Sequence, residues 1–333
     1  MNLADVAKHA RVSVATVSRV VNDSGAVKPA TRARVLKAIR ELKYHPNLHA
    51  RTLAEGRSRT LGMIVSNLEN PFFLDIFRAL ESEARRLGYE VFVANTDYRP
   101  RQLVSNVHLM MGRRLDGLAV IVSEMEPSLI QELTESNLRV IFCDLGVPSR
   151  HTSNIRVHYQ KGIQKTVEYL HTLGHRRMAF VGHHTTLESL HDRKKAFLET
   201  MKRYAGEVEF AIAADSDSPS GGQQATRRLL ASGFKPTAII CINDFMAIGV
   251  MKGLREQGLV VPDDVSVTGY DNISLAEFTA PALTTVNIPR ERIGHLVFEA
   301  LVPEREDSDH WGREYLIDPE LVVRESTGPA SKP

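Results

Sequence analysis

Short apolar runs alternate with amphipathic helical patterns through most of this 333-residue chain. A first set of runs lies at residues 61–65, 90–94, 118–122 and 140–143, with helical patterns between them at 73–87, 102–112 and 128–136. The alternation restarts with runs at 178–181, 210–213, 238–242 and 265–268. Buried strands that alternate with amphipathic helices indicate parallel sheets covered on both faces by right-handed crossovers. We therefore predict an α/β core with two lobes, each built on a doubly wound parallel sheet.

The first 22 residues have the pattern of two short helices joined by a tight turn. Asn2 and Ser13 can each cap a helix, and Asp5 can complete a capping box with Asn2. Apolar residues at helical spacing give each helix one small face: Leu3, Val6, Ala7 and Ala10 in the first, Val17, Val20 and Val21 in the second. This pattern predicts a helix-turn-helix, in which the second helix enters the major groove of DNA.

The start and outer face of the second helix carry Val14, Ala15, Ser18 and Arg19. Arg19 can make a bidentate contact to guanine, and Val14 and Ala15 can make apolar contacts, for example to a thymine methyl group. Thr16 and Asn22 are better placed for phosphates, which set the register of a complex but carry no sequence information. These side chains are the predicted DNA contacts of the helix-turn-helix.

Charge is distributed unevenly along the chain. Residues 1–60 contain 12 Lys and Arg against 4 Asp and Glu, whereas the remaining residues contain 30 basic and 36 acidic side chains. A helical hairpin from some other small domain would also fit the apolar pattern. A basic head on an acidic remainder, however, is the electrostatic footprint of a DNA-binding domain.

A third helix is predicted from residue 29 to residue 42, with apolar positions at Ala33, Leu36, Ala38, Ile39 and Leu42. This helix completes an all-α head with a small three-helix core. It ends before the segment 44–46, because Pro46 breaks a helix. Residues 47–55 then form a short helical pattern that ends at Gly56.

These stretches resemble the lactose/galactose repressor family of bacterial transcription regulators. The matching segments of the head are 5–7, 12–22, 28–32, 42–47, 50–51 and 53–54. Further matches follow at 69–73, 173–175, 243–249, 269–271 and 324–329. The resemblance thus covers the chain from end to end. The Val14-Ala15 pair is more similar to the galactose and catabolite-control branches than to the lactose repressor.

The resemblance implies three parts: a DNA-binding domain at 1–46, a hinge helix and linker at 47–60, and an effector-binding and dimerisation core at 61–333. The core is expected to be periplasmic-binding-protein-like, with lobe 1 at about 61–157 and 289–317 and lobe 2 at about 158–288 and 318–329. In the family the hinge helix pairs with its twin and inserts a leucine into the minor groove; Leu53 matches that leucine and Ala50 the adjacent contact. The energetic cost of unstacking one base step is offset when the bent duplex contacts more of the protein.

Ligands of open parallel sheets bind beyond the carboxyl ends of the strands. Ser66, Asp144, Asn243 and Asp271 lie directly after predicted strands or at their ends, and Phe72 and Phe73 can add an apolar wall. Arg193 matches the family arginine that holds sugar hydroxyls or acidic groups. These seven residues are the predicted effector site. Helix capping or turn formation is the alternative for Asp144, Asn243 and Asp244, and it explains Asp244 at least as well as ligand contact does. Core packing is the alternative for Phe72.

One segment departs from the family pattern. Several sugar-responsive members carry a stacking aromatic residue before the Ser-Gly of a helix in the second lobe, where this chain has Asp215-Ser216-Asp217-Ser218. Either another residue supplies the aromatic face, or the effector is not a simple hexose. Three carboxylates against one arginine among these residues make a multiply phosphorylated effector unfavourable, and a neutral polyol or a sugar acid bound by Arg193 is favoured instead.

Composition sets the remaining bounds. Cys143 and Cys241 each lie in an apolar run, which predicts two buried thiols in a reducing cytoplasm and neither a disulfide nor a metal site. No apolar run is long enough to cross a membrane, and no signal-peptide pattern is present. The polar tail lacks leucine heptads, so a homodimer is expected rather than a tetramer.

The predicted function is a cytoplasmic transcription regulator, expected to repress a carbohydrate or related catabolic operon. It should bind a pseudo-palindromic operator, respond to a sugar-like effector and need no cofactor. An enzyme is disfavoured because no catalytic constellation or phosphate-binding glycine loop is found, and His183, His184 and His191 fit a solvated loop. A secreted binding protein would not use the basic head. A regulator controlled by a partner protein, as in the catabolite-control branch, remains the alternative.

Overall fold

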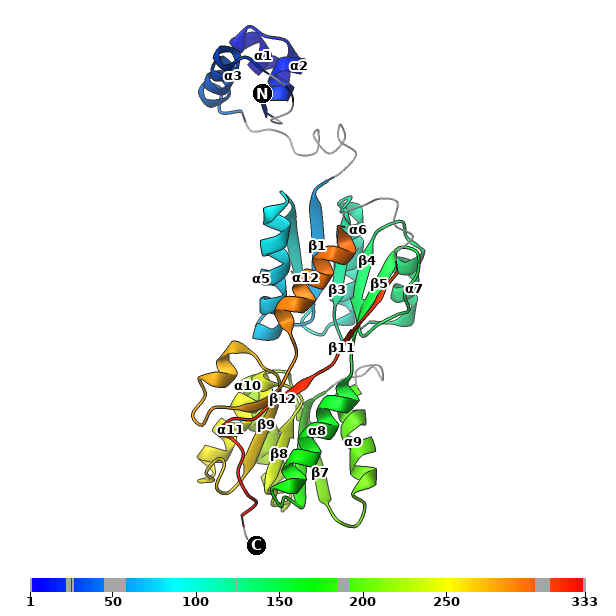
Figure 1. The fold of residues 1–333 in the computed structure, drawn as a ribbon, viewed down its shortest axis with the longest axis vertical. Coiled ribbons are helices and arrows are strands. Elements are labelled where there is room, and N and C mark those ends of the chain that lie inside the picture. Colours follow the sequence, from blue (N-terminus) through cyan, green and yellow to red (C-terminus); the bar gives the residue numbers. More distant parts are fainter. Residues whose placement is uncertain are drawn as a thin grey trace. The chain divides into compact units, whose positions relative to one another are not determined.

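The computed structural model describes residues 2–21, 25, 27–44, 58–123, 125–184, 192–302 and 312–331. It divides into two compact units, Met1–Arg59 and Thr60–Pro333, which we call the head and the core. Figure 1 shows the elements of both.

The described part of the head consists of three helices: α1 (Leu3–Ala10), α2 (Val14–Val21) and α3 (Pro29–Glu41). The predicted capping box is present, because the Asn2 side chain accepts hydrogen bonds from the backbone N–H of Ala4 and Asp5, and Asp5 accepts from the Asn2 N–H at 2.8 Å. The Ser13 Oγ accepts a hydrogen bond from the Thr16 N–H at 3.2 Å. Both caps satisfy amides that a helix start leaves unpaired.

The core of the head forms where the three helices meet. Its buried apolar side chains are Val6, Ala7, Ala10, Val17, Val20, Val35, Ala38 and Tyr44. The predicted inner face of α3 was partly wrong, because Val35 is buried whereas Leu36 and Ala33 are exposed. Ala38 is buried as expected, and Ile39 and Leu42 pack partly against this cluster.

Each lobe of the core has a six-stranded sheet. The order in lobe 1 is β11 (Glu314–Ile317), β5 (Thr152–Val157), β4 (Val140–Cys143), β3 (Gly117–Ile121), β1 (Thr60–Val65) and β2 (Glu90–Asn95). The order in lobe 2 is β12 (Glu320–Val322), β10 (Thr284–Asn287), β9 (Ser266–Asp271), β8 (Ala238–Cys241), β6 (Arg177–His183) and β7 (Glu209–Asp215). All pairs are parallel except β10–β12, which is antiparallel. The predicted fold class of two doubly wound parallel sheets is thereby confirmed.

Helices connect and cover the strands of both lobes (Figure 1). Those of lobe 1 are α5 (Pro71–Arg86), α6 (Pro100–Gly112), α7 (Pro127–Glu135) and α12 (Arg290–Leu301). Those of lobe 2 are α8 (Tyr159–Thr172), α9 (Asp192–Arg203), α10 (Pro219–Ala231), α11 (Asp244–Glu256) and the short 3-10 helix η2 (Ser274–Glu277). Gly294 lets α12 approach α5 closely, since a Cβ there would lie 2.5 Å from the Cβ of Ala79.

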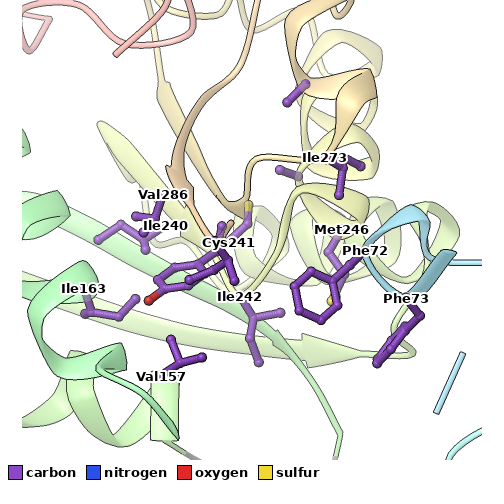
Figure 2. Packing of buried hydrophobic residues seen from close by; sticks show 14 of the residues in the cluster. Phe72, Phe73, Val157, Ile163, Ile240, Cys241, Ile242, Met246, Ile273 and Val286 are labelled. Atoms are coloured by element: carbon purple, nitrogen blue, oxygen red, sulfur yellow. The ribbon is translucent and has the colours of Figure 1, made fainter. Parts of the chain in front are cut away.

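The chain crosses between the lobes three times: from β5 to α8, from β10 to α12, and from β11 to β12. The largest cluster of buried apolar residues therefore contains side chains from both lobes. Phe72 and Phe73 at the start of α5 belong to the same cluster as Ile242 and Met246 of lobe 2 (Figure 2). Over the residues that are described, no helix is long and apolar enough to cross a membrane.

Candidate functional site

A cavity lies between the lobes, where the carboxyl ends of the strands of both sheets meet. Its free volume is about 760 Å³, including the part open to solvent. Side chains from both lobes line it: Asn70, Phe72, Phe73, Tyr98, Ile121, Val122, Ser123, Cys143, Asp144, Leu145, Tyr159, His183, Arg193, Asp217, Ile242, Asn243 and Asp271. The wall thus combines aromatic rings with a few polar groups.

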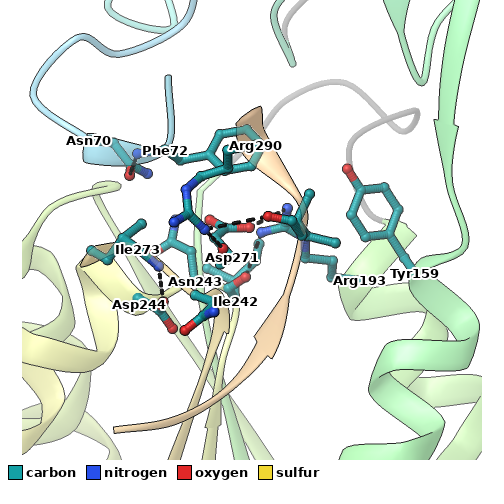
Figure 3. A network of polar contacts seen from close by, with 12 residues as sticks. Asn70, Phe72, Tyr159, Arg193, Ile242, Asn243, Asp244, Asp271, Ile273 and Arg290 are labelled. Carbon is teal, nitrogen blue, oxygen red and sulfur yellow. Dashed lines mark hydrogen bonds and ion pairs between the residues drawn. The ribbon is translucent and has the colours of Figure 1, made fainter. Parts of the chain in front are cut away.

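Arg193 is the second residue of α9, and its guanidinium lies in the cavity wall (Figure 3). Its Nη1 donates a hydrogen bond to the Ile242 carbonyl oxygen at 2.7 Å, and its Nη2 lies 3.0 Å from the Asp271 Oδ1. The guanidinium is also 4.7 Å and 4.4 Å from the ring centroids of Tyr159 and Tyr270. Burial is the largest single effect and disfavours the charge, but the Asp271 carboxylate together with Tyr159 and Tyr270 outweighs it, so the pKa of Arg193 is raised. The guanidinium is therefore charged and held in one orientation.

Asp271 ends β9 in a strained conformation, with φ +103°. Burial raises the pKa of its carboxyl to about 6, although the charge of Arg193 opposes the increase. Strained backbone at a non-glycine residue costs about 1–3 kcal/mol and is common at ligand sites. The strain therefore supports a role for Asp271 in the cavity rather than in packing alone.

Asp144 also has a positive φ, +58°, directly after β4. Its Oδ1 accepts from the Val157 N–H at 2.7 Å and its Oδ2 from the Tyr159 hydroxyl at 2.6 Å. Burial is the main cause that raises the pKa of this carboxyl. Both oxygens are engaged with the protein, so Asp144 connects the first crossing between the lobes to the cavity wall.

Asp217 precedes α10 and is 8% exposed. Its Oδ1 accepts a hydrogen bond from the Asn243 Nδ2 at 2.6 Å, and its Oδ2 accepts one from the hydroxyl of Tyr98 in lobe 1. Its backbone carbonyl accepts from the Asn67 Nδ2, also in lobe 1, at 3.2 Å. The loop before α10 is therefore hydrogen-bonded across the cavity.

Asp244 directly follows Asn243 in the sequence but has a different role. Its Oδ2 accepts from the Ile273 N–H at 2.8 Å (Figure 3). Its Oδ1 accepts from the Thr285 hydroxyl at 2.5 Å. It is fully buried and is not among the cavity-lining residues. Its contacts hold the segment after β9 against β10, so its role is structural.

Arg290 connects the two lobes at the second crossing (Figure 3). Its Nε donates to the Asp75 Oδ2 of α5 at 2.9 Å, and its Nη1 donates to the Asp271 carbonyl oxygen. Arg290 therefore links the backbone of Asp271 in lobe 2 to α5 of lobe 1.

The outer face of α2 is available for DNA. Val14 is 47% exposed, Ala15 and Arg19 are also exposed, and Thr16 and Ser18 are partly buried. The Thr16 hydroxyl lies 2.9 Å from the Ser13 Oγ at the start of the helix. The other three predicted DNA contacts, Asn22, Ala50 and Leu53, lie outside the described residues, as does the hinge segment 47–57.

The described residues contain no group of three or more His, Cys, Asp or Glu side chains placed to hold a metal ion. Burial raises the pKa of the Cys143 and Cys241 thiols well above the usual value. A neutral thiol is a poor nucleophile.

Two family models match this chain: the bacterial regulatory proteins of the lacI family over residues 2–47, and a periplasmic binding protein-like domain over residues 167–327. A repressor named PurR from Photobacterium profundum is 32% identical over 324 residues, covering 97% of each chain. The chain belongs to the lacI family of bacterial regulatory proteins. It is a sequence-specific DNA-binding repressor and not an enzyme.

Solved structures of lacI family regulators share the fold. A Lac repressor dimer bound to operator and the anti-inducer ONPF has a TM-score of 0.82 and 29% identity, and the match covers 98% of this chain and 99% of that one. A lacI family regulator from Enterococcus faecium with bound ribose has a TM-score of 0.71 and 25% identity, covering 81% and 99%. The family and the fold expected from the motifs are confirmed.

The structure brings most of the predicted effector residues together. Phe72, Phe73, Asp144, Arg193, Asn243 and Asp271 all line the cavity. Ser66 does not: it is fully buried, and its Oγ accepts a hydrogen bond from the Ser123 N–H at 3.0 Å. The side chain of Asn243 also caps α11 by accepting from the Met246 N–H at 2.8 Å. The capping alternative and the cavity position therefore both apply to Asn243. Binding of an effector by these residues stays a prediction.

Sequence reasoning missed several residues of the cavity wall: Asn70, Tyr98, Ser123, Tyr159 and Asp217. The loop 215–218 lacks the stacking aromatic residue of several family members, and the residue of this loop that lines the cavity is Asp217. The assignment of His183 to a solvated loop was wrong, because it ends β6 and lines the cavity. Ser123 could have been found from its position after β3, whereas Tyr98 follows an edge strand and gave no such signal.

Proposed function

We propose that a small-molecule effector binds in the cavity between the lobes and changes the affinity of the protein for its operator. The observation that carries this proposal is Arg193 with Asp271, a charged pair built into a cavity that residues of both lobes line. A ligand that contacts both lobes favours one angle between them. The lobes would rotate about the three crossings of the chain, and Arg290 joins the cavity to α5.

We further propose that the protein acts as a homodimer in the cytoplasm on a pseudo-palindromic operator. Each subunit would insert α2 into one half-site, since paired recognition helices bind half-sites about one helical turn apart. Paired hinge segments at 47–60, with Leu53 as the wedge, would bend the central base pairs. Effector binding would then alter the spacing of the two hinges.

The effector is expected to be a small polar ring compound. A sugar-like effector is the prediction from sequence, and the ribose-bound regulator is a relative of that type. The aromatic side chains of the cavity would accept the face of a nucleobase equally well. The test therefore includes sugars, sugar acids, nucleosides and nucleobases.

A thermal-shift panel with the purified full-length protein tests the proposal. A ligand at about 100 times its dissociation constant stabilises the folded protein by about 2.7 kcal/mol, which raises the melting temperature by a few degrees. Each compound that raises it is then added to an operator-binding titration. A change in operator affinity supports the proposal and separates inducer from corepressor. A panel without any effect on operator affinity contradicts it and favours control by a partner protein.

A further inference from the structure

The loop before α10 carries a carboxylate at the cavity, and the aromatic ring beside it comes from the other lobe. Asp217 is the residue of this loop that lines the cavity. Tyr98 reaches it from lobe 1, and the Tyr98 ring lies 5.4 Å from the imidazole of His183. One of the two alternatives left by the sequence, a substitute aromatic residue from elsewhere, thus has a specific candidate.

The backbone at Tyr98 is strained. Asp97 and Tyr98 are consecutive non-glycine residues in the left-handed region, with φ +50° and +57°. A hydrogen bond of 2.5 Å from the Asn95 Nδ2 to the Asp97 Oδ1 supports this turn. Left-handed non-glycine residues persist where surrounding contacts impose them, and such positions cluster at ligand sites. The turn directs Tyr98 into the cavity instead of into solvent.

The charges of the cavity wall are unequal. Three carboxylates, those of Asp144, Asp217 and Asp271, face one guanidinium, that of Arg193, among the described lining residues. Arg193 is already paired with Asp271 at 3.0 Å and hydrogen-bonded to Ile242. Among the described lining residues, a phosphate group would therefore meet more negative than positive charge, because the one guanidinium is already paired. Like charges in a partly buried site repel strongly because the local dielectric constant is low.

Asp217 retains acceptor capacity. A carboxylate offers about four lone-pair positions. Among the described residues, the side chains that donate to Asp217 are Asn243 and Tyr98, which occupy one position on each oxygen. The remaining positions can accept from a hydroxyl or amino group of a ligand. Hydrogen bonds to a charged acceptor are stronger than those between neutral groups.

We propose that Tyr98 and Asp217 determine effector specificity: Tyr98 supplies the ring face, and Asp217 selects a neutral or cationic ring compound that donates hydrogen bonds while rejecting its phosphorylated counterpart. This inference rests on the proposed effector cavity and names the chemical class of its ligand.

Matched pairs of compounds test the proposal: ribose and ribose 5-phosphate, glucosamine and glucosamine 6-phosphate, adenosine and its 5′-monophosphate. The melting temperature of the full-length protein is measured with each compound and with inorganic phosphate. We expect stabilisation only by unphosphorylated members. A phosphorylated compound or phosphate that stabilises more, or a panel in which no unphosphorylated member stabilises, overturns the assignment of ligand class.

Variants of the two residues give the second arm. Asp217→Asn removes the charge and should lower the affinity for a stabilising compound about tenfold. It should also reduce the difference in affinity between that compound and its phosphorylated counterpart. Tyr98→Ala should lower the affinity for that compound several-fold, whereas Tyr98→Phe, which keeps the ring, should lower it less. Asp215→Asn is the matched control, because Asp215 ends β7 two residues before Asp217, pairs with Arg228 and does not line the cavity. Equal effects of Asp215→Asn and Asp217→Asn would overturn the role of Asp217.

Measurements of operator affinity separate a failure of the ligand class from a failure of the proposed regulation. If an unphosphorylated compound binds in a manner that depends on Asp217 but leaves operator affinity unchanged, the ligand class stands and the proposed regulation fails. If a phosphorylated compound changes operator affinity, the proposed regulation stands and the ligand class fails.

Discussion

Arg19 and Arg193 carry the same guanidinium group in opposite surroundings. Arg19 lies on the exposed face of α2, whereas the side chain of Arg193 is 15% exposed and fixed between two tyrosine rings and a carboxylate. A planar guanidinium can donate two parallel hydrogen bonds to one partner. In the head this property suits a base edge, and in the cavity it orients Arg193 before any ligand arrives.

Arg19→Ala should weaken specific operator binding by about 1–3 kcal/mol and relax the preference at one base position, because a bidentate contact to guanine is lost. Binding to a set of operators with single base changes measures both effects. Arg34→Ala removes an equal charge from an exposed position of α3 and should not alter sequence preference. Unchanged specificity in Arg19→Ala would contradict the assignment of Arg19.

Asp244 gives the chain a pH dependence. Burial, and next the charge of Asp271, raise the pKa of Asp244 to about 8. Because this pKa is higher in the folded chain than in the unfolded chain, where it is about 4, the folded protein holds the proton more tightly, and that stabilisation is lost progressively from about pH 4 to about pH 8. The melting temperature should therefore fall between about pH 5 and about pH 8, and this group should contribute no further fall above that. Asp244→Asn, which mimics the protonated acid, should reduce the fall, whereas a change at the exposed Asp263 should not; equal slopes would refute this role.

At the scale of elements, the contact between α10 and α11 positions part of the cavity wall. A Cβ at Gly222 would lie 2.1 Å from the Met246 carbonyl oxygen, and a Cβ at Gly249 would lie 1.7 Å from the Pro219 carbonyl oxygen. The absence of side chains at these glycines lets the two helices approach closely. Their amino-terminal ends then bring Asp217 and Asn243 within hydrogen-bonding distance.

Gly249→Ala should destabilise the core by about 1–3 kcal/mol or more, because the added methyl group forces the two helices apart. Thermal or urea unfolding of the full-length protein measures the loss. Gly112→Ala, at the end of α6, is the matched control: no heavy atom lies within 4 Å of its added Cβ, so its effect should stay within about 0.5 kcal/mol. Similar losses in both variants would show that the close approach of α10 and α11 is not the cause.

The hinge segment can be tested on DNA. Leu53→Ala should reduce bending of the operator and operator affinity, because a methyl group cannot hold a base step unstacked. Bending is measured from the mobility of permuted DNA fragments, and effector binding should be unaffected. A variant that bends the operator as the wild type does would rule out the wedge role.

The order of most elements follows from the sequence, because apolar runs and helical periodicity report burial directly. Four strands were missed: β5, β10, β11 and β12. They lie where the chain crosses between the lobes, and polar residues such as Asn154 and Arg156 interrupt their apolar pattern. The inner face of α3 was misplaced toward Leu36 because its apolar residues do not define one stripe.

At the cavity, residues directly after central strands were found, whereas Tyr98 depends on a turn that no local pattern predicts.

At the scale of the whole molecule, regulation requires that the cavity and the operator influence each other through the lobes. The second crossing provides a short route, in which the Arg290 guanidinium joins the Asp271 backbone to Asp75 of α5. Coupling between two sites is reciprocal: the factor by which an effector changes operator affinity equals the factor by which the operator changes effector affinity.

Arg290→Met should reduce this coupling while largely preserving the fold, because the variant keeps a long side chain but cannot bridge the lobes. Coupling factors in allosteric proteins are typically about 5–150-fold, and we expect the factor to fall toward one. Operator affinity is measured with and without a compound from the panel, and the affinity for that compound with and without operator. Arg227→Met is the matched control, since it breaks an ion pair of 2.7 Å with Glu256 within lobe 2 alone. If both variants retain wild-type coupling, the signal between cavity and operator does not depend on Arg290, and the other two crossings must carry it.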